Sequence, residues 1–151
     1  MPRTLRDRVF QGWWRLSRPL TLGVRGVVTD ADGRVLLLRH TYTPGWHFPG
    51  GGVERGETTL LAVTRELTEE AGVVPRTPPR LVSVHSNHVN HPGDHVLVYR
   101  VDAWDQIAAT QRGEIAEVAF FDPQSPPENI TKGTARRLAE LFSGAPVSAD
   151  W

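Results

Sequence analysis

The stretch from Gly51 to Val73 reads GGVERGETTLLAVTRELTEEAGV, and it decides how the rest of the chain is interpreted. Thr58 or Thr59 is suited to cap the start of a helix, and Gly72 is suited to end one in a left-handed conformation. The pattern therefore predicts a helix from about Thr58 to Ala71.

The predicted helix has two distinct faces. At about 100° per residue, its apolar side chains form a stripe for burial made of Leu60, Val63, Leu67 and Ala71. Three carboxylates, Glu69, Glu66 and Glu70, lie at roughly 180°, 240° and 280° from Leu60. Like charges at this spacing repel, so a positive group is expected beside them. That group is either Arg65, which would leave a solvated acidic face, or a bound cation.

The loop that precedes the helix favours the cation. Pro49-Gly50-Gly51-Gly52 leaves the main chain uncovered by side chains, as a site for an ion or a phosphate requires. Mg²⁺ prefers carboxylate and carbonyl oxygens and is often completed by water and substrate phosphates. The loop and the three glutamates together predict a site for a hard divalent cation.

The same segment resembles the signature of the Nudix hydrolase family. That signature is filled here without a departure, by Gly51, Glu57, Arg65, Glu66, Leu67, Glu69, Glu70, Gly72 and Val73. At a frequency of about 7% for each residue type, its seven invariant letters would coincide by chance roughly once in 10⁸ starting points. The resemblance covers about residues 20–142. It implies an α/β (α+β) fold, the Nudix-type α/β/α sandwich with a mixed β-sheet.

The resemblance also implies a chemistry. Nudix hydrolases use a divalent metal, Mg²⁺ or Mn²⁺, to cleave a phosphoanhydride bond in a nucleoside diphosphate linked to another group, such as a nucleoside triphosphate or a nucleotide-sugar. Some subfamilies carry markers beyond the signature, and the proline of ADP-ribose enzymes is replaced here by Val89. The alternative is a catalytically silent nucleotide-binding or regulatory module, which the intact glutamate set disfavours.

Individual roles follow from the resemblance. It makes Glu69 and Glu70 metal ligands, with the carbonyl of Gly50 as a third. Glu66 is either a further ligand or the base that activates water. Arg65 is expected to orient Glu57 or a catalytic glutamate through its bidentate fork. The predicted catalytic residues are thus Glu66, Arg65 and Glu70.

Outside the signature, other residues are candidates for the site. Glu114 precedes a predicted strand and is either a further metal ligand or base, or a surface acid. Arg39 could bind a substrate phosphate. Trp46 and Phe48 could stack on a base or sugar, although core packing explains them equally well.

Four histidines crowd the stretch SVHSNHVNHPGDH, namely His85, His88, His91 and His95. The cluster could suggest a zinc site, but zinc ligands are usually held by defined secondary structure, and this stretch resembles a polar loop between strands. We therefore expect a loop that contacts substrate. A neutral histidine in such a loop could serve as a base. Plain solvent exposure is the alternative.

The overall composition suits one domain. The 151 residues carry 17 basic and 17 acidic side chains and no cysteine, which excludes disulfides and thiolate sites and gives no sign of nucleic-acid binding. No apolar run is long enough for a signal peptide or membrane span. We expect a cytoplasmic protein that acts on a small nucleotide-type molecule, and the sequence leaves a homodimer open.

Three regions are predicted along the chain. Residues 1–19 form an extension with an amphipathic helix over residues 4–17, which packs on the domain, on a second subunit or on a membrane surface. Residues 20–145 form the Nudix domain, and residues 146–151 are a tail.

The secondary-structure pattern of the domain predicts a mixed sheet between helices. Residues 21–29 and 34–39 read as a hairpin around the turn Asp30-Ala31-Asp32-Gly33. Further strands are expected at residues 80–85, 95–101 and 117–121, and a last helix at residues 132–142.

Overall fold

The computed structural model of the chain describes residues 13, 16–17, 19–111 and 113–151. The predicted helix over residues 4–17 lies largely outside the described residues. Within them the elements follow in this order: β1 (Thr21–Val28), β2 (Val35–His40), β3 (Trp46–His47), α2 (Thr59–Ala71), β4 (Val73–Pro75), β5 (Arg80–Ser86), β6 (Asp94–Val101), β7 (Trp104–Gln106), β8 (Ile115–Phe121) and α3 (Lys132–Phe142).

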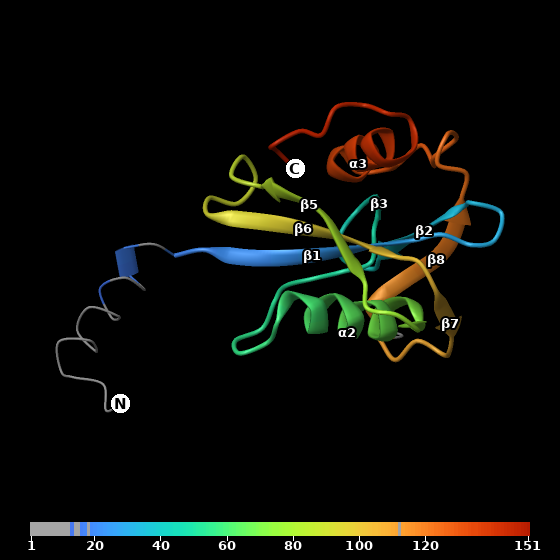
Figure 1. Ribbon diagram of the computed structural model, residues 1–151, viewed down its shortest axis with the longest axis horizontal. Coiled ribbons are helices and arrows are strands. Elements are labelled where there is room, and N and C mark those ends of the chain that lie inside the picture. The colour runs from blue at the N-terminus through green and yellow to red at the C-terminus, as the bar shows by residue number, and fades with distance from the viewer. Residues whose placement is uncertain (1–12, 14–15, 18, 112) are drawn as a thin grey trace.

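The strands form a middle layer with α2 on one side and α3 on the other (Figure 1). Strand β6 lies between β1, which runs parallel to it, and β5, which runs antiparallel. Strand β2 pairs antiparallel with β3 and with β8, and the short strands β4 and β7 pair with each other. The predicted α/β/α sandwich with a mixed sheet is confirmed.

The predicted hairpin between the first two strands is wrong beyond its turn. The amide of Gly33 donates to the Asp30 carbonyl at 3.1 Å, so the turn forms. A single bridge then joins Thr29 to Val35, after which β1 pairs with β6 while β2 pairs with β8. Turn chemistry is local, whereas each strand pairs with a segment far away in the chain, Thr21 with Asp94 and Val35 with Phe121.

Helix α2 begins and ends as the sequence predicts. Thr58 is the N-cap, with its hydroxyl accepting from the Leu61 amide at 3.2 Å, and Gly72 ends the helix with a φ of 65°. Its apolar residues pack into one core cluster with β1 and β6, through Ala62, Val63, Leu67 and Ala71.

The buried face of α2 is rotated from the predicted stripe. Leu60 is 38% exposed, whereas Glu66 and Glu70 are 8% and 4% exposed. The helical pattern placed these carboxylates on a separate face from the core. They are buried because the glycine loop lies over them, with the Gly50 amide in contact with Glu70.

Residues 146–151, predicted as a tail, pack against the domain. The Ser86 amide of β5 donates to the Ala149 carbonyl, and the Trp151 amide donates to the Ser86 carbonyl, both at 2.8 Å. Arg137 of α3 is fully buried, bonds to Glu140 at 2.7 Å and lies over the Trp151 ring.

Two further expectations concern a membrane span and a homodimer. The described part of the chain contains no helix of the length and apolarity that a bilayer crossing requires. The homodimer stays a prediction.

Candidate active site

The glycine loop is attached to strand β1 through the main chain. The amides of Val24 and Gly26 donate to the carbonyls of Gly51 and Pro49 at 2.9 and 2.8 Å. Gly50 has a φ of 146°, and a side chain there would collide with the Val24 carbonyl. Only glycine therefore allows the loop to lie this close to the strand.

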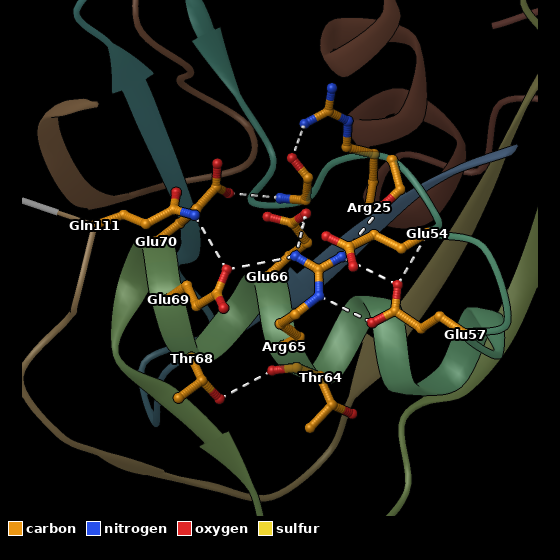
Figure 2. Close-up of polar contacts among 12 residues, drawn as sticks. Arg25, Glu54, Glu57, Thr64, Arg65, Glu66, Thr68, Glu69, Glu70 and Gln111 are labelled. Carbon is orange, nitrogen blue, oxygen red and sulfur yellow. Dashed lines mark hydrogen bonds and ion pairs between the residues drawn. The ribbon is translucent and has the colours of Figure 1, made fainter. Parts of the chain in front are cut away.

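Arg65 connects the carboxylates at the helix surface (Figure 2). Its Nε and Nη2 donate to the two oxygens of Glu57 at 2.9 and 3.1 Å. Its Nη1 donates to Glu66 at 2.8 Å and reaches Glu69 at 3.4 Å. Hydrogen bonds to Glu57 and then to Glu66 raise the pKa of Arg65 despite its partial burial. This is the geometry expected of an orienting arginine.

Two of the signature carboxylates are buried. Burial raises the pKa of Glu70 to about 7, and repulsion from Glu66 adds to this effect, although the Gly50 amide donates to Glu70 Oε2 at 2.8 Å. Burial likewise raises the pKa of Glu66, against the lowering effect of Arg65. Carboxylates in this state resist ionisation unless a cation approaches them.

A cavity of about 410 Å³ opens between α2, the glycine loop and the end of β2. The acids Glu66, Glu70 and Glu114 contribute to its lining together with Gly50. The other lining residues are Arg25, His40, Tyr42, Thr43, His47, Gly51, Gly52 and Gln111. Of the predicted site residues, Gly50, Glu66 and Glu70 therefore meet at one cavity with the loop acid Glu114, whereas Glu69 and Arg65 are not among its lining residues.

Three predicted substrate contacts lie elsewhere. Trp46 and Phe48 are 8% and 0% exposed and pack in the core cluster that contains Leu138 of α3. Arg39 pairs with Glu117 at 3.0 Å and lies over the Trp46 ring. None of the three lines the cavity, so we do not retain them as substrate contacts.

Side-chain alternation explains why these residues do not line the cavity. Arg39 lies opposite Trp46 in the β2–β3 pair, and adjacent residues of an extended segment point to opposite faces. The neighbours His40 and His47 therefore face the cavity where Arg39, Trp46 and Phe48 do not. The predicted segments border the cavity, but the opposite face of each segment meets it.

The histidine stretch also lies away from the cavity. His88 and His91 are exposed in the turn between β5 and β6. His85 is buried, with its ring nitrogens at 2.8 Å from the Ser148 carbonyl and 2.7 Å from the Ser83 hydroxyl. None of the four histidines lines the cavity, so the cavity does not support the substrate-contacting loop, which stays a prediction.

Gln111 was missed by the sequence analysis. Its side-chain amide donates to Glu69 Oε2 at 3.0 Å, as Figure 2 shows. The main-chain amides of Thr110 and Gln111 donate to the Glu69 carbonyl at 3.0 and 2.9 Å. These contacts attach the loop that carries Glu114 to the end of α2. A lone glutamine in a loop gives no signal in the sequence.

Arg25 and His40 were missed as well. Arg25 of β1 donates from Nη1 to the carbonyls of Gly50 and Phe48, at 2.8 and 3.2 Å. Burial lowers the pKa of Arg25, and Glu70 opposes this effect. His40 Nε2 lies 3.7 Å from Glu70 Oε1. An arginine within the apolar run Leu22-Gly23-Val24-Arg25-Gly26-Val27 was the available signal, because a charge at an inward position needs a partner.

The donor set fits a divalent cation that is completed by its substrate. Nowhere in the described ranges do three histidine, cysteine, aspartate or glutamate side chains form a ready cluster for a metal. Mg²⁺ is often held by one or two carboxylates with substrate phosphates and water, so a full protein cage is not required. The buried Glu70 and Glu66, with raised pKa values beside the glycine loop, match that requirement.

Comparison with known proteins places this site in a family. Residues 19–141 match the NUDIX domain. A relative from Methanocaldococcus jannaschii, named ADP-ribose pyrophosphatase, is 32% identical over 76% of this chain and 69% of its own. A relative from Sodalis glossinidius, named RNA pyrophosphohydrolase, is 35% identical over 78% of this chain and 80% of its own.

Among solved structures, the MutT Nudix hydrolase from Burkholderia pseudomallei superposes with a TM-score of 0.70. It is 25% identical and covers 81% of this chain and 98% of its own. The chain belongs to the Nudix hydrolase family. The enzyme class that this membership supports is that of a Nudix pyrophosphohydrolase.

Proposed function

We propose that the protein is a divalent-metal-dependent hydrolase that cleaves a pyrophosphate bond in a nucleoside diphosphate linked to another group. One observation carries the proposal. The complete signature places Glu66 and Glu70 on the wall of a cavity, both buried and both with raised pKa values, directly beneath a glycine loop. A highly charged diphosphate and its cation are the ligands that such a cavity suits.

The chain's own residues have separable roles in this proposal. Glu69, Glu70 and the Gly50 carbonyl would hold Mg²⁺ or Mn²⁺, which supplies positive charge to the phosphate oxygens when bound. Arg65 holds the carboxylates of Glu66 and Glu69 through Nη1. Glu66 is a second ligand or the base for the attacking water.

Among substrates we favour a small nucleotide derivative. The two relatives differ in the substrate that their names state, ADP-ribose for one and RNA for the other. The proline marker of ADP-ribose enzymes is absent at Val89, and a net charge of zero gives no electrostatic support for a long RNA. Nucleoside triphosphates and nucleotide-sugars remain the first candidates.

A substrate panel tests the proposal. Purified protein is incubated with nucleoside triphosphates, nucleotide-sugars, ADP-ribose and 5′-triphosphorylated RNA, each with Mg²⁺, with Mn²⁺ and with EDTA. Release of nucleotide monophosphate, diphosphate or phosphate is measured, and Glu69→Gln serves as the ligand-deficient control. We expect metal-dependent turnover of at least one small nucleotide. Binding without turnover of any substrate would favour the silent regulatory module instead.

A further inference from the structure

Arg25 and His40 form one wall of the cavity, and both carry nitrogen atoms that make no hydrogen bond to a described residue. Arg25 employs only Nη1, in its bonds to the Gly50 and Phe48 carbonyls. Its Nε and Nη2 donate to no described residue, and neither is among the described nitrogens that are sealed from solvent without a partner. These two donors are therefore not sealed from solvent, and Arg25 lines the cavity.

His40 lines the same cavity and has one ring nitrogen without a hydrogen-bond partner among the described residues. Its side chain is 9% exposed, and its Nδ1 is buried without a hydrogen-bond partner within the described part of the chain. A buried polar atom in a native protein normally has a partner, so one that lacks it needs an explanation. His40 lines the same cavity as Arg25.

The two residues also lie in a suitable electrostatic setting. Arg25 and His40 line the same cavity, and Arg25, after burial, contributes to lowering the pKa of His40. Arg25 lines the same cavity as the acids Glu66 and Glu70. The cavity thus has acidic groups suited to a cation and a fixed guanidinium suited to an anion.

We propose that Arg25 and His40 form an anion-binding wall that takes phosphate oxygens of the substrate's diphosphate group. The identification of this anion as the substrate rests on the proposed function. A guanidinium presents a planar fork that matches phosphate geometry. Two carbonyl contacts already hold this guanidinium in place, so little side-chain freedom remains to be lost when the anion binds.

The wall would orient the diphosphate through residues that lie outside the signature. Neither Arg25 nor His40 belongs to the signature, which ends at Val73 and begins at Gly51. A diphosphate held on one side by the cation and on the other by Arg25 would be fixed in orientation. Arg25 would at the same time steady the Gly50 carbonyl, a candidate metal ligand, because it donates to that oxygen at 2.8 Å.

Binding of a diphosphate that cannot be hydrolysed tests the wall. Methylenediphosphonate is titrated calorimetrically into the full chain in the presence of Mg²⁺, for the wild type, Arg25→Gln and His40→Ala. Arg39→Gln is the matched control, because Arg39 precedes His40 in β2 and pairs with Glu117 outside the cavity. We expect Arg25→Gln to weaken binding about tenfold or more, the usual loss for a charge-assisted hydrogen bond. His40→Ala should weaken binding to a lesser extent, and Arg39→Gln should not.

A thermal midpoint measured for each variant separates binding from folding. Unchanged affinity in a folded Arg25→Gln protein would overturn the wall, as would equal losses in Arg25→Gln and Arg39→Gln. If Arg25→Gln does not fold, Arg25→Lys retains the charge and loses the fork, and wild-type affinity in that variant would overturn the proposal.

The two proposals, the anion-binding wall and the enzyme function, can be contradicted independently of each other. Diphosphonate binding that depends on Arg25, without hydrolysis of any nucleotide, would support the wall and contradict the enzyme. Where the wild type does hydrolyse a nucleotide, the wall predicts a raised KM for Arg25→Gln, and an unchanged KM contradicts it while leaving the enzyme assignment intact.

Discussion

Replacing Glu70 by glutamine should make the metal-free protein more stable while removing a proposed metal ligand. The Glu70 carboxylate is 4% exposed, and burial raises its pKa from an ordinary 4.5 to about 7. Glutamine has nearly the same shape and carries no charge. Its side-chain oxygen can still accept from the Gly50 amide, which lies 2.8 Å from Glu70 Oε2.

The size of the effect follows from the pKa. At about 1.4 kcal/mol per pH unit, a rise from 4.5 to about 7 means that ionised Glu70 costs the fold about 3 kcal/mol above pH 7. The folded state holds this proton more tightly than the unfolded state does. The stability that the protonated Glu70 carboxyl contributes to the fold is therefore fully present below pH 4.5 and is lost as the pH rises through about 7.

Thermal unfolding in EDTA measures this difference. At pH 8 the midpoint of Glu70→Gln should exceed that of the wild type by about 6–12 °C, at about 2–4 °C per kcal/mol for a domain of this size. The two proteins should converge near pH 4. Added Mg²⁺ should stabilise the wild type more than the variant, because binding to the folded state raises stability.

Glu57→Gln is the matched control. Hydrogen bonds from Arg65 lower the pKa of Glu57, so this carboxylate stabilises the fold when it is ionised. The variant should consequently be less stable than the wild type at pH 8. A Glu70→Gln protein that is no more stable than the wild type at pH 8, or whose advantage persists unchanged at pH 4, would refute the reasoning.

Three further substitutions separate the roles of the site. Gln111→Leu removes the amide that holds Glu69 Oε2 at 3.0 Å, and Mn²⁺ binding measured by electron paramagnetic resonance should weaken about tenfold. Gln106→Leu is its control, because Gln106 bonds only to carbonyls near the end of α2. This control should lower the thermal midpoint and leave the Mn²⁺ affinity unchanged. Arg65→Lys keeps the charge but loses the fork on Glu57, so kcat at saturating metal should fall at least about tenfold, and a wild-type kcat would contradict an orienting role. Phe48→Ala should cost about 3–5 kcal/mol of unfolding free energy with an unchanged KM in the folded fraction, whereas a raised KM at full stability would return Phe48 to the substrate site.

Much of the site could be predicted because its information is local. The bounds of α2, its cap at Thr58 and its left-handed end at Gly72 depend on residues within one or two turns of each other. The spacing of Glu66, Glu69 and Glu70 follows from helical geometry alone. The signature resemblance then supplied the family, which the match over residues 19–141 confirms.

The rest of the site depends on contacts that short-range patterns do not encode. Arg25 meets the Gly50 carbonyl across 25 residues, and Gln111 meets Glu69 across 42 residues. Which face of a strand points to the cavity depends on register, and a change of one residue exchanges His40 for Arg39. In these cases a sequence pattern can indicate the segment but not the side chain that meets the cavity.

By itself, then, the sequence determined the acidic helix, the glycine loop and the class of chemistry, because each is written in neighbouring residues. Tertiary structure alone decided that Glu70 is buried beneath the loop, that β1 pairs with β6, and that Arg25 and His40 share a cavity with the acids. The physical reason is that burial, strand pairing and cavity lining are properties of segments brought together by folding. Local spacing predicts the chemical groups that are available, and packing determines their environment and their partners.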